Sequence, residues 1–131
     1  MKKIIGILLI GIIICSCSSD DDTSNTSSNI VGTWNWARTF GGFGGVTTTP
    51  ASSGNVIRLE ITNTTIKRYM NDDLISESDY TIEMSQTTSG ESLEIIISNG
   101  GNRTMIDLEG AILSLTGEAD DSSTSEYLRD E

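Results

Sequence analysis

Short segments in which hydrophobic and polar residues alternate make up most of the chain after residue 29. In the segment 55–62, apolar side chains stand at every second position from 57 to 61, which is typical of a half-buried strand. Eight segments carry this pattern or a similar enrichment in β-branched and aromatic residues. They are predicted as strands at 30–39, 55–62, 65–70, 74–84, 92–98, 103–108, 111–116 and 124–129.

Most connections between these segments are short and contain residues that tolerate a positive φ, such as Asn71-Asp72-Asp73 and Glu109-Gly110. Such turns join antiparallel neighbours, whereas parallel strands need crossovers of about a dozen residues. No window shows sustained helical periodicity. The pattern therefore predicts an all-β, eight-stranded antiparallel up-and-down sheet. Closure into a β-barrel would remove its two exposed edges, so we expect a barrel.

The amino-terminal segment has a different pattern. Lys2 and Lys3 precede an apolar run, 4–14, that is too short to span a bilayer, which needs about 20 residues. A basic start followed by a short apolar core is typical of an export signal.

The run ends in Ile14-Cys15-Ser16-Cys17. This motif resembles the bacterial lipobox, which has a branched aliphatic residue at −3, a small residue at −1 and the acylated cysteine at +1. Cys15 is the competing acceptor, but Ile14 would then stand where a small residue is required. The resemblance implies a lipoprotein signal peptide at 1–16, lipidation of Cys17 and an exported protein anchored to a membrane. A plain secretory signal is the alternative.

Residues 18–29 contain no apolar side chain, so we interpret 17–29 as the lipidated cysteine and a flexible polar tether. The acidic run Asp20-Asp21-Asp22 resembles a surface-export signal of some Gram-negative lipoproteins, and a solvated spacer is the alternative. We expect the outer membrane, with display at the cell surface as one possibility. The remaining segment, 30–131, is predicted to be one domain.

Composition narrows the possible functions. The chain has 8 basic and 19 acidic residues, and without Lys2 and Lys3 the net charge changes from −11 to −13. This charge argues against nucleic-acid binding. The absence of histidine removes the commonest general base and metal ligand, and no Gly-x-Ser-x-Gly motif is present. We expect no enzyme, catalytic residue, metal or cofactor, and a monomer.

Several motifs occur in an order that resembles one family. The first predicted strand contains Gly32-Thr33-Trp34, a glycine-rich loop follows at 41–45, and the last strand contains Tyr127-Leu128-Arg129. Together with the lipobox and the tether, this order resembles the bacterial lipocalin-like domain lipoproteins (calycin/lipocalin-like family). The resemblance implies a lipocalin-like barrel over 30–131, with Trp34 at its floor and Arg129 laid across that ring.

The same resemblance places the loop between the first two strands at the open mouth of the barrel. We therefore consider it a candidate ligand lid, either mobile or permanently sealing that end. The candidate lid and ligand residues are Phe40, Gly41, Gly42, Phe43, Gly44, Gly45 and Trp36.

An eight-stranded barrel is just wide enough to be filled by side chains or to hold one small ligand. We predict a membrane-anchored lipoprotein whose barrel binds a small apolar molecule. The alternatives are a filled barrel that contacts protein or glycan through its loops, and an inhibitor of hydrolases. Arg38, Arg58 and Arg68 are expected to form ion pairs on the outer surface, with Glu60, Glu77 or Asp79, unless one points inward toward a ligand carboxylate.

Overall fold

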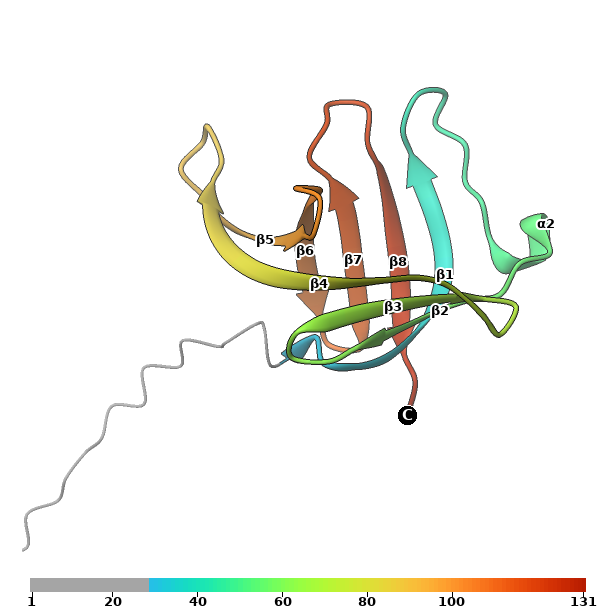
Figure 1. Cartoon of the computed structure of the whole chain (residues 1–131). Coiled ribbons are helices and arrows are strands. Elements are labelled where there is room, and N and C mark those ends of the chain that lie inside the picture. Colours follow the sequence, from blue (N-terminus) through green and yellow to red (C-terminus); the bar gives the residue numbers. More distant parts are fainter. Residues whose placement is uncertain (1–28) are drawn as a thin grey trace, which may run out of the picture.

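A computed structural model describes residues 29–131 of the chain. Its eight strands form a closed antiparallel barrel in which neighbours in sequence are neighbours in space (Figure 1). The strands are β1 (Gly32–Gly41), β2 (Ile57–Ile61), β3 (Thr65–Met70), β4 (Asp73–Gln86), β5 (Ser92–Ser98), β6 (Arg103–Glu109), β7 (Ile112–Gly117) and β8 (Ser123–Arg129). The predicted all-β, up-and-down architecture is confirmed. The signal peptide, Cys17 and residues 18–28 of the tether lie outside the described residues.

The first and last strands hydrogen-bond to each other, which closes the sheet. Their antiparallel register runs from Trp34 opposite Arg129 to Gly41 opposite Ser123. A β-bulge interrupts this register between Trp36 and Arg38. Because β1 also pairs with β2, neither strand is left as an edge, as the closure argument predicted.

Turn chemistry accounts for the tight connections. Asn71 and Asp72 have φ values of 52° and 71° and form the two-residue connection between β3 and β4. Positive φ at both central residues is the requirement of a type I′ hairpin turn, which Asn and Asp meet at lower cost than other side chains. The register that follows places Met70 opposite Asp73.

The barrel interior is filled mainly by one cluster of buried side chains. Its members are Ile30, Trp34, Trp36, Ile57, Leu59, Ile61, Tyr80, Ile96, Ile106, Leu113 and Tyr127. The alternation in β2 predicted its inward face correctly. In β5 the apolar residues Leu93, Ile95 and Ile97 share one face; Ile95 is buried, at 2% exposed, but the residue that joins the main core cluster is Ile96. Three consecutive isoleucines supply apolar side chains to both faces, so the pattern could not choose between them.

One short helix was not predicted. Helix α2 (Pro50–Ser53) lies in the long connection between β1 and β2. Thr49 caps it and forms a reciprocal capping box with Ser52, while Pro50 occupies the first turn. At four residues it is too short to show the 3.6-residue periodicity on which the prediction relied. Within residues 29–131, no helix is long and apolar enough to cross a membrane.

Candidate functional site

Trp34 and Arg129, the two residues expected at the barrel floor, pack against each other. The Trp34 side chain is fully buried, and its indole Nε1 donates a hydrogen bond of 2.8 Å to the backbone carbonyl of Ile30. The Arg129 guanidinium lies 4.2 Å from the centroid of the Trp34 ring, and its Nη1 donates to the carbonyl of Val31. A cation thus covers the Trp34 ring, and a backbone carbonyl of the segment before β1 accepts a hydrogen bond from that cation.

Gly32 is required by this arrangement. Its φ is 143°, and a Cβ atom at this position would stand 2.9 Å from Nη1 of Arg129. Any larger residue would therefore displace the guanidinium from the Trp34 ring as well as straining the backbone. This close approach gives the glycine of the Gly-x-Trp motif a physical reason.

Strands β1 and β2 separate toward the end of the barrel that lies away from Trp34. We call this separation the β1–β2 split. The pairing of the two strands ends where Asn35 stands opposite Arg58. Strand β1 continues to Gly41 alongside β8, while the connection to β2 returns separately and meets β1 again through paired hydrogen bonds between Thr39 and Thr48. The second half of this connection, including α2, lies beside β1 before β2 begins (Figure 1).

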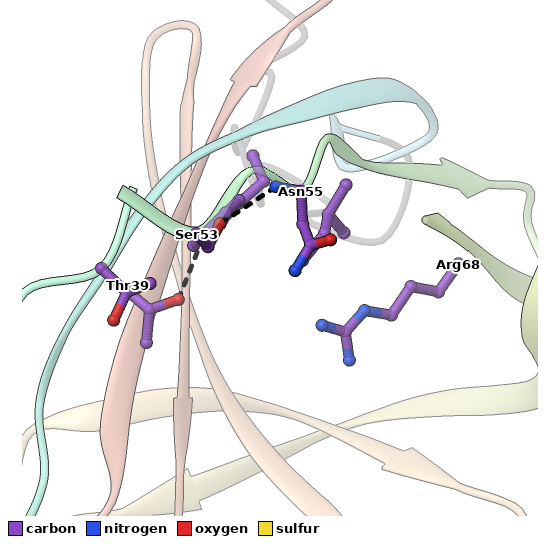
Figure 2. A pocket seen from close by; sticks show the side chains of 7 residues that line it. Thr39, Ser53, Asn55 and Arg68 are labelled. Atoms are coloured by element: carbon purple, nitrogen blue, oxygen red, sulfur yellow. Dashed lines mark hydrogen bonds between the residues drawn. The ribbon is translucent and has the colours of Figure 1, made fainter. Parts of the chain in front are cut away.

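A pocket of about 290 Å³ lies at this split. Figure 2 shows its wall, with Thr39 on one side and the Arg68 side chain reaching in from the other. The lining combines two apolar side chains from the barrel core with hydroxyl, amide and guanidinium groups. The lining residues are Trp36, Thr39, Thr48, Ser53, Asn55, Ile57 and Arg68.

Arg68 shares the face of β3 that carries core residues, but its own side chain is exposed. In the register of β2 and β3 it stands opposite Leu59, which is buried in the core, and on β4 it stands opposite Ser76. Its positive charge acts on the phenol of Tyr127: burial raises the pKa of Tyr127, and the Arg68 charge opposes part of that rise. The pocket therefore contains a cation close to the barrel core.

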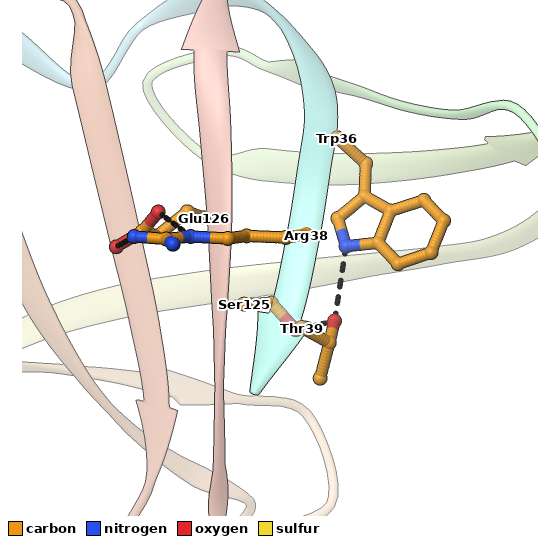
Figure 3. A network of polar contacts seen from close by, with 5 residues as sticks. All are labelled: Trp36, Arg38, Thr39, Ser125 and Glu126. Carbon is orange, nitrogen blue, oxygen red and sulfur yellow. Dashed lines mark hydrogen bonds and ion pairs between the residues drawn. The ribbon is translucent and has the colours of Figure 1, made fainter. Parts of the chain in front are cut away.

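Hydrogen bonds fix the β1 side of the pocket. The Trp36 indole Nε1 donates 2.9 Å to the Thr39 hydroxyl, which is also 2.8 Å from the hydroxyl of Ser125 on β8 (Figure 3). The bulge between Trp36 and Arg38 keeps Trp36 and Thr39 on the same side of the strand, because it shifts the alternation by one residue. The indole plane is therefore held in place at the pocket wall.

The opposite face of β1 carries an ion pair. Arg38 donates from Nε and Nη2 to the two carboxylate oxygens of Glu126, at 2.6 and 3.1 Å (Figure 3). This hydrogen bonding lowers the pKa of the Glu126 carboxyl and raises the pKa of Arg38. Arg38 also covers the ring of Phe40, with 4.9 Å from its guanidinium carbon to the ring centroid.

Other charged groups on the outer surface are paired in the same way. Arg58 contacts Glu60 at 3.3 Å and stands 4.6 Å from the ring centroid of Tyr69, whose hydroxyl donates to Glu60. Arg103 pairs with Glu118 at 2.6 Å. The expected ion pair of Arg58 with Glu60 is present, whereas Arg38 pairs with Glu126 instead of one of the predicted partners.

The candidate lid residues are separated by the structure. Trp36 lines the pocket, but Phe40 and the glycines from Gly41 to Gly45 do not, and Phe43 is 96% exposed. The connection contributes to the pocket through its second half, with Thr48, Ser53 and Asn55. Sequence reasoning missed these three, because the Thr49-Pro50 cap that folds them against β1 was not recognised as a helix start.

Neither a metal site within residues 29–131 nor a known relative indicates the function further. Residues 29–131 contain no group of three or more Cys, Asp or Glu side chains placed to hold a metal ion. No protein-family model matches the chain, and no curated protein matches it significantly. Among solved structures, a de novo designed fluorescence-activating β-barrel is similar over 80% of this chain and 97% of its own, with 15% identity and a TM-score of 0.37. That likeness is too distant to inform the function of this chain.

Proposed function

We propose that this protein is a membrane-tethered lipoprotein whose barrel binds a small molecule with an apolar body. The observation that carries the proposal is the pocket at the β1–β2 split. Its volume of about 290 Å³ is just below the range of ligand pockets, about 300–1,000 Å³. Trp36 and Ile57 offer apolar contact, and the surrounding hydroxyl and amide groups offer orientation.

The position of the pocket suits a tethered binder. The described chain enters at the floor end, where Trp34 lies, and the connection between β1 and β2 is at the opposite end of the barrel (Figure 1). A lipid on Cys17 would therefore be connected to the floor end of the barrel, and the pocket would lie away from the point of attachment. The lid role of Gly41–Gly45 stays a prediction.

Filling the pocket tests ligand binding. Ser53→Trp places an indole at the lining, whereas Ala51→Trp adds the same bulk to the exposed side of the same helix, outside the lining. Native mass spectrometry of the protein purified from its own host should detect a retained small molecule in the wild type and in Ala51→Trp, and less of it in Ser53→Trp. Equal retention in both variants would place the ligand elsewhere, and no retained molecule in any of the three would contradict the binding function.

The anchor is tested separately. Cys17→Ala should move the protein from the membrane fraction to the soluble fraction, because two or more acyl chains give stable anchoring and their loss leaves none. Cys15→Ala is the matched control and should stay in the membrane fraction. If Cys17→Ala still sediments with membranes, the lipid anchor at this residue is wrong.

The alternative function, a surface domain that contacts protein or glycan through its loops, is favoured by a different observation. Phe43 and Val46, in the connection after β1, are 96% and 69% exposed. Exposed apolar side chains of this kind are common at interaction surfaces. Phe43→Ser with Val46→Ser should abolish partner binding under this function, whereas a loss of small-molecule retention with partner binding intact would favour the lid role of the loop.

A further inference from the structure

Arg68 differs from the other arginines of residues 29–131 in having no partner. Arg38, Arg58 and Arg103 form ion pairs with glutamates, and Arg129 stacks on Trp34 and donates to Val31. Within residues 29–131, the Arg68 guanidinium makes no ion pair within 4 Å and none of the hydrogen bonds that fix the others. It is also the arginine that lines the pocket.

The position of Arg68 in the sheet places this unpaired guanidinium beside the apolar wall of the pocket. Its neighbour across β2 is Leu59, which is 3% exposed, and the same pocket wall contains Trp36 and Ile57. The Arg68 side chain itself is exposed, so an anion from solution can reach its guanidinium. Because no carboxylate of residues 29–131 pairs with this guanidinium, its donors at the pocket are available to a carboxylate from outside.

We propose that Arg68 is the anion-binding group of the pocket and that the ligand is a small organic acid, with its carboxylate on Arg68 and its apolar body against Trp36 and Ile57. This inference rests on the proposed binding function. The planar guanidinium presents paired N–H donors that match the two oxygens of a carboxylate.

The charge of the pocket lining and the volume of the pocket indicate which kind of anion would fit. The pocket lining contains a single cation, Arg68, and no other charged side chain, so it offers compensation for one negative charge. The chain as a whole has a net charge of −11, which repels polyanions. A volume of about 290 Å³ suits a short acid and excludes long acyl chains from full burial.

The test compares two probes that differ in charge. We would titrate 3-phenylpropanoate and its neutral amide, 3-phenylpropanamide, into the purified full chain in mild detergent by calorimetry, with protein-free micelles as the reference. The wild type should bind the carboxylate more tightly than the amide. Arg68→Gln should weaken carboxylate binding about ten- to hundred-fold, the range for a hydrogen bond to a charged group, and leave amide binding unchanged.

Arg58→Gln is the matched control. It removes the same charge from the adjacent strand, on the outer face where Arg58 pairs with Glu60, and should change neither affinity. Arg68→Lys keeps the charge but loses the paired donors, and should bind the carboxylate with intermediate affinity. Circular dichroism of each variant would verify that the barrel is folded.

Each contrary result has its own meaning. Unchanged carboxylate binding in folded Arg68→Gln, or equal losses in Arg58→Gln, would overturn the role of Arg68 while leaving the small-molecule function standing. Displacement of the carboxylate by inorganic phosphate at comparable affinity would overturn the assignment to organic acids. If the wild type bound neither probe and the native protein also retained no molecule, the proposed function itself would fail.

Discussion

Removal of the Trp34 side chain should cost this protein a large share of its stability. The side chain is fully buried and belongs to the barrel core. Truncation of a buried aromatic residue to alanine costs about 3–5 kcal/mol. The cation over the ring contributes about 0.5–2 kcal/mol on its own, and this contribution overlaps with the first. A domain of about 100 residues has a free energy of unfolding of about 5–15 kcal/mol, so Trp34→Ala should leave it marginally stable.

Two further variants separate the parts of this effect. Trp34→Phe keeps an aromatic face beneath Arg129 but removes the Nε1 donor from the buried carbonyl of Ile30, which should cost about 1–3 kcal/mol. Trp36→Phe is the matched control. It also loses an indole donor, but the acceptor, the Thr39 hydroxyl, keeps its hydrogen bond with Ser125, so the loss should be smaller.

The assay is equilibrium unfolding in urea, followed by tryptophan fluorescence and by circular dichroism. The expected order of the free energy of unfolding is wild type, then Trp36→Phe, then Trp34→Phe, then Trp34→Ala, with an unchanged denaturant dependence in the variants that fold. If Trp34→Ala lost only about 0.5 kcal/mol, the size of a surface substitution, Trp34 would not be the structural floor of the barrel.

Two other perturbations test parts of the same argument. Gly32→Ala should destabilise the fold, because its Cβ would stand 2.9 Å from Arg129 Nη1 at a φ of 143°. Gly44→Ala is the control: no atom beyond its chain neighbours lies within 4 Å of its Cβ, so this variant should lose only the stability that backbone strain costs. Equal melting temperatures for the two variants would refute the steric role of Gly32. The ion pair with Arg38 lowers the pKa of Glu126, so it stabilises the fold above the unfolded pKa of Glu126, near 4.5, and this stabilisation is lost as pH falls through the folded value. Glu126→Gln should therefore flatten the acid side of a plot of melting temperature against pH, and an unchanged acid limb would contradict this coupling.

The order and position of the strands could be determined from the sequence alone. A period of two and turn residues such as Asn71-Asp72 are local signals, because side-chain alternation and positive φ depend on the residue and its immediate neighbours. The closure of the barrel also followed, since eight short antiparallel strands leave two edges that only closure removes. The lipobox resemblance at Cys17 depends on sequence in the same way, and remains a prediction.

The pocket depends on the tertiary structure and could not be predicted from the sequence. The end of the β1–β2 pairing at Asn35, the bulge after Trp36 and the return of the connection to Thr39 all depend on which strand pairs with β1 at each level. Arg68 shows the same dependence. Its residue type permitted either an outer ion pair or a cation at the pocket, and the register with Leu59 places it, still exposed, at the pocket. Alternation shows which residues share a face, but only pairing between distant segments determines which face encloses the ligand space.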